Sequence, residues 1–239
     1  TQAVTLDAFN AYLRGFRDDL RISLFGFGNF SSDALRRIAA RVQPFVGAKA
    51  GTSLATTRIQ PVAGVHVDFR RKSVLDDSAL ADAYLATEAG PASKAKAMLL
   101  EGLLSTRFYA QLRTEEQLGY LVNAFPIMVG QYGGIGFGVQ SPVQGSAYLE
   151  ERFRSFYPQF ATDLAGIDAQ EFEQVRQGLI ASMTKTPDTL EEEFGWVEGD
   201  LRIGNTAFDT RTRIVAALKA ARLVDVVKFY ESMITKGQS

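Results

Sequence analysis

The stretch from Leu112 to Tyr120 constrains the fold more than any other part of the chain. It follows a long segment with the apolar spacing of a helix, and it precedes a segment that alternates in the manner of a strand. A helix-to-strand turn changes the direction in which side chains project, so Arg113 and Tyr120 could point into one cleft. The alternative interpretation is a solvated helix end, in which Arg113 and Glu116 form a pair three residues apart.

The helix before this junction is predicted to begin at Ser93 and to continue to about Gln117. The sequence Gly90-Pro91-Ala92-Ser93 is a helix-start signal in which Ser93 is the expected N-cap. Gly119 is placed as the glycine that lets a chain leave a helix in a left-handed conformation. The residues expected on the buried stripe of this helix are Met98, Leu99, Leu103, Phe108 and Leu112.

The segment from Tyr120 to Gln140 is predicted to be a β-hairpin that turns at residues 130–133. In its return strand Gly134, Gly136 and Gly138 alternate with apolar residues, which leaves one face as bare backbone. Such a strand loses packing, so we expect a helix, a neighbouring domain or a bound chain to approach that face closely. Phosphate binding is the alternative, but the P-loop spacing is absent.

The first part of the chain is predicted to contain a helix from Thr5 to Leu20, a strand from Arg21 to Phe30, and a second helix capped by Ser31 or Ser32. The glycines at 26 and 28 form an incomplete dinucleotide fingerprint, because Ser31 stands in place of the third glycine. A nucleotide-binding α/β domain is therefore a further alternative. We expect the Arg21 to Phe30 strand to pack on the last domain or to pair between molecules, which would make a homo-oligomer.

The middle of the chain is predicted to contain a linker from Gly47 to Gln60, followed by strands from Gly64 to Phe69 and from Ala79 to Thr87. His66 is the only histidine, and a single imidazole with no second histidine is more typical of a structural residue than of a metal ligand. After the hairpin the chain is predicted to be helical, with a capping box formed by Asp168 and Glu171.

The composition describes an ordinary globular protein. Of its 239 residues 46% are hydrophobic and 22% are charged, and the net charge is -1. Lysine and arginine are scattered, so no nucleic-acid surface is predicted. No apolar run approaches the length of a membrane span, so we expect no membrane contact. The absence of cysteine excludes thiolate nucleophiles, disulfides and cysteine metal sites.

The Arg-Thr-Glu-Glu-Gln-Leu-Gly-Tyr string at residues 113–120, the helix from Asp168 to Met183 and the ending at residues 226–230 resemble the C-terminal portion of the pitrilysin/insulinase zinc metallopeptidases. The resemblance covers most of the chain. It implies an α+β domain whose largely antiparallel sheet is covered by helices on one face. It also implies that residues 1–58 are the tail of a preceding homologous domain plus a linker, and that residues 59–239 are the C-terminal non-zinc domain.

The resemblance further implies a substrate-enclosing role rather than independent catalysis. The family signature His-x-x-Glu-His is absent, so this chain alone is predicted to bind no metal and to be inactive. Zinc would belong to the full-length enzyme, on an N-terminal half absent from this chain. Arg113 and Tyr120 would then orient the peptide substrate and stabilise the oxyanion of the tetrahedral intermediate.

Three further expectations concern the alternative function, the completeness of the chain and its compartment. A non-catalytic scaffold or heterodimer partner of a zinc peptidase is the alternative function. The start at Thr1 has no initiator methionine or signal peptide, so we expect a fragment. Relatives in Gram-negative bacteria are often periplasmic, so the resemblance implies the periplasm, with the cytoplasm as the alternative.

Overall fold

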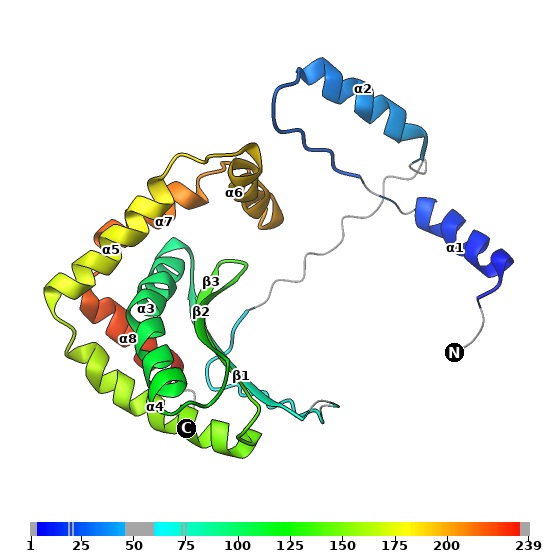
Figure 1. Cartoon of the computed structure of the whole chain (residues 1–239). Helices are drawn as coiled ribbons and strands as arrows, with labels where there is room; N and C mark the ends of the chain where they lie inside the picture. Colours follow the sequence, from blue (N-terminus) through cyan, green and yellow to red (C-terminus); the bar gives the residue numbers. More distant parts are fainter. Residues whose placement is uncertain are drawn as a thin grey trace. The chain divides into compact units, whose positions relative to one another are not determined.

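In a computed structural model the chain divides into two compact units, Thr1–Thr57 and Arg58–Ser239 (Figure 1). The structure describes residues 4–18, 20, 22–45, 60–72, 74 and 76–234. The predicted linker from Gly47 to Gln60 lies outside the described residues, apart from its last residue. The assignment of the first unit to a preceding homologous domain stays a prediction.

The first unit contains two helices, α1 (Leu6–Asp18) and α2 (Ser32–Val42), and a short 3-10 turn, η1 (Gln43–Phe45). The predicted caps are confirmed. The Oγ1 atom of Thr5 accepts a hydrogen bond from the backbone N–H of Ala8 at 3.2 Å. The Oγ atom of Ser31 accepts one from the backbone N–H of Ala34 at 3.3 Å. These bonds satisfy donors that the first turn of a helix cannot pair internally.

The predicted strand from Arg21 to Phe30 is wrong, because the described residues 22–30 form no strand. Gly28 has a φ of 122°, and the backbone N–H of Phe30 bonds to the carbonyl of Gly28 at 3.1 Å, so the chain bends back on itself. The ring of Phe30 also lies over Gly26. Without a strand, both the dinucleotide alternative and the proposed pairing into a homo-oligomer lose their basis.

The second unit is built on an antiparallel sheet of three strands, β1 (Ser78–Ala89), β2 (Leu121–Val129) and β3 (Tyr132–Ser141), in the order β1-β3-β2. The predicted hairpin and the strand predicted from Ala79 to Thr87 are confirmed. The other strand, predicted from Gly64 to Phe69, is wrong. Gly64 forms a turn with a φ of 73°, and the residues that follow belong to no strand.

Helices cover one face of this sheet, as Figure 1 shows. Helix α3 (Pro91–Tyr109) packs on β2 and β3, while α4 (Ser146–Ala165) and α8 (Leu223–Ile234) pack on β1. Helices α5 (Ala169–Thr184) and α7 (Thr210–Ala220) pack on α3, and α6 (Leu190–Arg202) lies between them in the sequence. Asp168 caps α5 as predicted, accepting from the backbone N–H of Glu171 at 2.7 Å. The predicted α+β fold, with an antiparallel sheet covered on one face, is therefore confirmed.

Aromatic side chains fill the space between the sheet and its helices. The ring of Phe108 on α3 lies 5.2 Å from Phe137 on β3, 5.4 Å from Phe153 and 5.1 Å from Phe156, both on α4. All four side chains are buried. Since Phe137 points into this core, the glycines that alternate with it face the opposite side. There Gly136 lies beneath the ring of Phe125, so the close approach comes from the neighbouring strand β2 and not from the expected helix, domain or bound chain.

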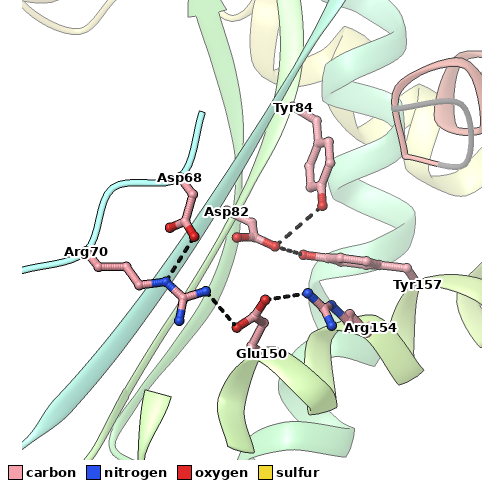
Figure 2. A network of polar contacts seen from close by, with 7 residues as sticks. All are labelled: Asp68, Arg70, Asp82, Tyr84, Glu150, Arg154 and Tyr157. Atoms are coloured by element: carbon pink, nitrogen blue, oxygen red, sulfur yellow. Dashed lines mark hydrogen bonds and ion pairs between the residues drawn. The ribbon is translucent and has the colours of Figure 1, made fainter. Parts of the chain in front are cut away.

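A polar network joins β1 to α4 at the edge of this core (Figure 2). The carboxylate of Asp82 accepts hydrogen bonds from the hydroxyl of Tyr157 at 2.7 Å and from that of Tyr84 at 3.4 Å. Burial raises the pKa of Tyr157, as do the neighbouring Tyr84 and Asp82. On the exposed side of this network, Glu150 pairs with Arg154 at 2.5 Å and with Arg70 at 3.4 Å. These outer pairs are exposed and add little stability.

Helix α3 begins earlier than predicted. Its N-cap is Gly90, with a φ of 104°, and Pro91 occupies the first turn, where a missing N–H costs nothing. Ser93 is therefore not the cap but a fully buried residue inside the helix. Its Oγ atom accepts a hydrogen bond from the backbone N–H of Gly133 at 3.0 Å, which ties the helix to β3.

Candidate functional site

The α-helical geometry of α3 changes at the motif. Residues Ala110–Glu115 form a π-helical segment, η2, in which the backbone N–H of Glu116 donates to the carbonyl of Gln111 at 2.9 Å. A π turn holds one more residue than an α turn and is less stable, so it persists where other contacts hold it, often at functional sites. Arg113 lies inside this turn. The apolar spacing predicted an uninterrupted helix to about Gln117 and gave no signal of the change.

Buried contacts hold the π turn in place. Leu112 and Leu118 are both buried, and the backbone N–H of Leu118 donates to the carbonyl of Leu112 at 3.0 Å. The carboxylate of Glu116 accepts two hydrogen bonds from Arg152 on α4, each 2.7 Å long, and one from the side chain of Gln111 at 3.1 Å. A two-point arginine–carboxylate pair fixes both distance and orientation.

The pair between Arg113 and Glu116 that spacing alone allowed is therefore not formed, because Glu116 is committed to Arg152. Burial by itself would raise the pKa of Glu116. The hydrogen bonds from Arg152 and Gln111, together with the positive charge of Arg152, outweigh that effect and lower the pKa below its ordinary value. The same contact raises the pKa of Arg152. Both groups are thus held in their charged forms.

Gly119 does not act as the left-handed residue after the helix. That conformation belongs to Gln117, whose φ is 53°. Gly119 is instead pressed against β3, where an added Cβ atom would lie 1.9 Å from the carbonyl oxygen of Gln140. The glycine is therefore needed for a close approach between backbones and not for its conformational freedom. This contact sets where β2 begins.

Arg113 and Tyr120, the predicted site residues, remain available to a ligand. Arg113 is half-buried, and neither its guanidinium nor the hydroxyl of Tyr120 makes a hydrogen bond or ion pair with another described residue. The side chain of Tyr120 is 82% exposed. One side chain comes from the π turn and the other from the residue before β2. Their convergence on one cleft, and their role in substrate binding, stay predictions.

The described residues do not fit a zinc site. They contain no group of three or more histidine, aspartate or glutamate side chains that could hold a metal ion. His66 is exposed in the segment before β1. A peptidase zinc site needs two imidazoles and a carboxylate, so this chain's side chains do not supply that set. None of the described helices combines the length and apolarity that a membrane crossing requires.

Comparison with known proteins identifies the relatives of this chain. Residues 99–197 match the family model described as PQQ synthase PqqF-like, C-terminal lobe domain 4. Protease 3 of Escherichia coli K12 is 32% identical over 237 residues, which cover 99% of this chain and 25% of that protein. The crystal structure of pitrilysin matches with a TM-score of 0.83 and 31% identity, over 97% of this chain and 25% of that one. The chain is similar to about a quarter of the length of a pitrilysin-type peptidase.

More distant similarities extend over nearly the same length of the chain. Insulin-degrading enzyme of Drosophila melanogaster is 26% identical over 244 residues, covering 98% of this chain and 24% of that enzyme. A protease structure from Helicobacter pylori shares the fold, with a TM-score of 0.66 at 11% identity. The chain thus spans about a quarter of the length of the curated relatives that it matches.

Proposed function

We propose that this chain is the non-zinc part of a zinc metalloendopeptidase, which encloses and orients a peptide for hydrolysis by a zinc-bearing N-terminal half. The observation that carries the proposal is a difference between two groups of residues within the segment 113–120. Glu116, Leu118 and Gly119 are committed to fixing the backbone, whereas Arg113 and Tyr120 have no partner among the described residues. The carboxylate of Glu116 could pair with Arg113 by spacing, but it pairs with Arg152 instead and leaves the guanidinium of Arg113 available.

The chemistry of the two free side chains suits this role. A guanidinium presents several fixed N–H donors, and a phenol presents one O–H donor. Aimed at the carbonyl oxygen of a bound peptide, these donors would orient it and would stabilise the negative charge that develops there during attack. Because this chain's residues do not fit zinc, its contribution would be orientation and charge stabilisation, and the metal would come from the other half.

The test is peptide cleavage by this chain mixed with the zinc-bearing N-terminal half of its own protein. We expect Arg113→Ala to lower kcat by about a hundredfold, the usual effect of losing one oxyanion donor, and Tyr120→Phe to lower it by at least about tenfold. Glu115→Gln is the matched control, since Glu115 is an exposed neighbour in the same turn. Unchanged kcat in both variants would contradict the proposed roles of Arg113 and Tyr120.

The same mixture separates this proposal from the scaffold alternative. Size-exclusion chromatography would first show whether the two halves form a complex. A complex that cleaves no peptide in any mixture would support a non-catalytic partner of a zinc peptidase. A complex that is active and equally active with every variant would keep the peptidase role and place the substrate contacts elsewhere.

A further inference from the structure

A hollow of about 250 Å³ lies where α3 and α7 begin. Its walls include Pro91 and Lys94 from the first turn of α3, Gln131 from the hairpin turn, and Asn205, Thr210 and Arg213 from the region around the start of α7. Arg113 follows the other end of α3, so the hollow is separate from the candidate site. An inference about it does not depend on the proposed function.

Lys94 is the unusual residue of this hollow. Its side chain reaches the hollow although the residue is only 9% exposed, and its ammonium makes no hydrogen bond or ion pair with any described residue. Burial lowers the pKa of Lys94, and the charge of Asp200 offsets that shift only in part. The stem of Lys94 is buried, while its ammonium faces the hollow with no protein group to accept from it, so a ligand there could accept its hydrogen bonds.

The two carboxylates near the hollow, those of Asp200 and Asp209, already accept hydrogen bonds from other groups. The Oδ2 atom of Asp200 accepts from the backbone N–H of Thr210 at 3.3 Å, and the Oδ1 atom of Asp209 accepts from the side chain of Asn205 at 2.9 Å. Arg213 stands at the rim, 58% exposed, with its guanidinium 4.0 Å from Asp209. The N-terminal ends of α3 and α7 add partial positive charge on the same side.

We propose that this hollow binds a single carboxylate group, which accepts hydrogen bonds from Lys94. The two cations and two carboxylates around the hollow balance one another, so the helix ends leave a small positive excess that suits a monovalent anion. A doubly charged phosphate would face Asp200 and Asp209 with an unbalanced negative charge. The volume holds several water-sized groups of about 30 Å³ each, enough for a short acidic side chain or a small free acid.

The test is a titration of the whole chain followed by backbone amide NMR. Sodium acetate is the probe, and sodium chloride at equal ionic strength corrects for salt. We expect saturable shifts at Gly204, Asn205 and Thr210, and a loss of affinity of about tenfold or more in Lys94→Met. Arg213→Gln should weaken binding less, because its guanidinium is more exposed. Lys219→Met, an exposed lysine on α7, should bind as the wild type does.

Two controls accompany the titration: the folding of Lys94→Met, and the comparison of a peptide carboxylate with a free acid. Lys94→Met should still unfold cooperatively, with a lower thermal midpoint than the wild type, because buried Asp200 loses the positive charge that faces it. A blocked glycine-glutamate-glycine tripeptide that binds where its glutamine counterpart does not would identify a peptide carboxylate, whereas binding of acetate alone would identify a free acid. Shifts that Lys94→Met leaves unchanged, shifts reproduced by chloride, or tighter binding of inorganic phosphate would overturn the proposal.

Discussion

At the scale of single residues, Gly119 gives the sharpest prediction. A Cβ atom there would lie 1.9 Å from the carbonyl oxygen of Gln140 and 3.1 Å from the Cα atom of Ser141, both in the backbone of β3. The backbone cannot move aside without disturbing the pairing of β2 with β3. We expect Gly119→Ala to lower the free energy of unfolding by about 3 kcal/mol, measured by urea denaturation.

Gly138→Ala is the matched control for this effect. Its nearest obstacle is the side-chain oxygen of Asn123 at 2.9 Å, and a side chain on the open face of the sheet can rotate away. We expect a cost below about 1 kcal/mol. Equal costs for the two substitutions would show that the backbone contact at Gly119 is not the reason for its glycine.

Gly119 and Ser93 also show where reasoning from local sequence fails. Both residues match a helix-end pattern. The structure shows a different reason for each residue, namely a contact with β3. Gly133 and Gln140, the residues they meet, are distant along the chain. A pattern of neighbours cannot contain that information, because the contact exists only after the sheet has formed. Thr5 and Ser31, whose caps involve only the next few residues, are predicted correctly.

At the scale of elements, the pair between Glu116 and Arg152 should decide whether the π turn stays docked on α4. Both side chains are mostly buried, at 18% and 27% exposure. We expect Glu116→Gln to lower the free energy of unfolding by about 2 kcal/mol at neutral pH, since a charged hydrogen-bonded pair is broken. Glu115→Gln, an exposed neighbour, should change it by less than about 0.5 kcal/mol.

The pH dependence of this difference follows from the lowered pKa of Glu116. The contribution of the ionised carboxylate is fully present above its ordinary pKa of 4.5 and is lost as the pH falls through the lower folded value. We therefore expect urea unfolding between pH 3 and pH 7 to show that the wild type and Glu116→Gln differ less in free energy of unfolding below about pH 4.5. A difference that stays constant with pH would argue that Glu116 acts through shape and not through charge.

The elements predicted correctly combine a periodic apolar pattern with clear turn glycines, as in helix α3 and in the hairpin of β2 and β3. The strand predicted at residues 21–30 is as long as β3, and the one at residues 64–69 is shorter. Neither is a strand among the described residues, because alternation alone does not guarantee a partner strand. The π turn has no sequence signal, because it depends on the anchoring of Glu116 by α4. The place of Arg113 and Tyr120 at a helix-to-strand junction singles them out in the sequence, and a resemblance supplies their role. Only their lack of partners comes from the structure.

At the scale of the whole molecule, the two units differ in how they are stabilised. The second unit contains the whole described core, from Ala86 to Ile234. In the first unit no described residue is buried, and α1 exposes apolar side chains such as Phe9, Tyr12 and Phe16. Since burial of apolar surface is the main source of folding free energy, the second unit should account for nearly all of the chain's stability.

Truncation tests this division of stability. We expect residues 58–239 alone to unfold cooperatively in urea, with a free energy of unfolding within about 1 kcal/mol of that of the full chain, because the truncation removes no core residue. We also expect trypsin to cut the full chain first within residues 1–57, where none of the described side chains of α1 and α2 is buried and able to resist opening. Loss of cooperative unfolding in the truncated chain would show instead that the first unit completes the fold. That result would contradict its assignment as the tail of a separate preceding domain.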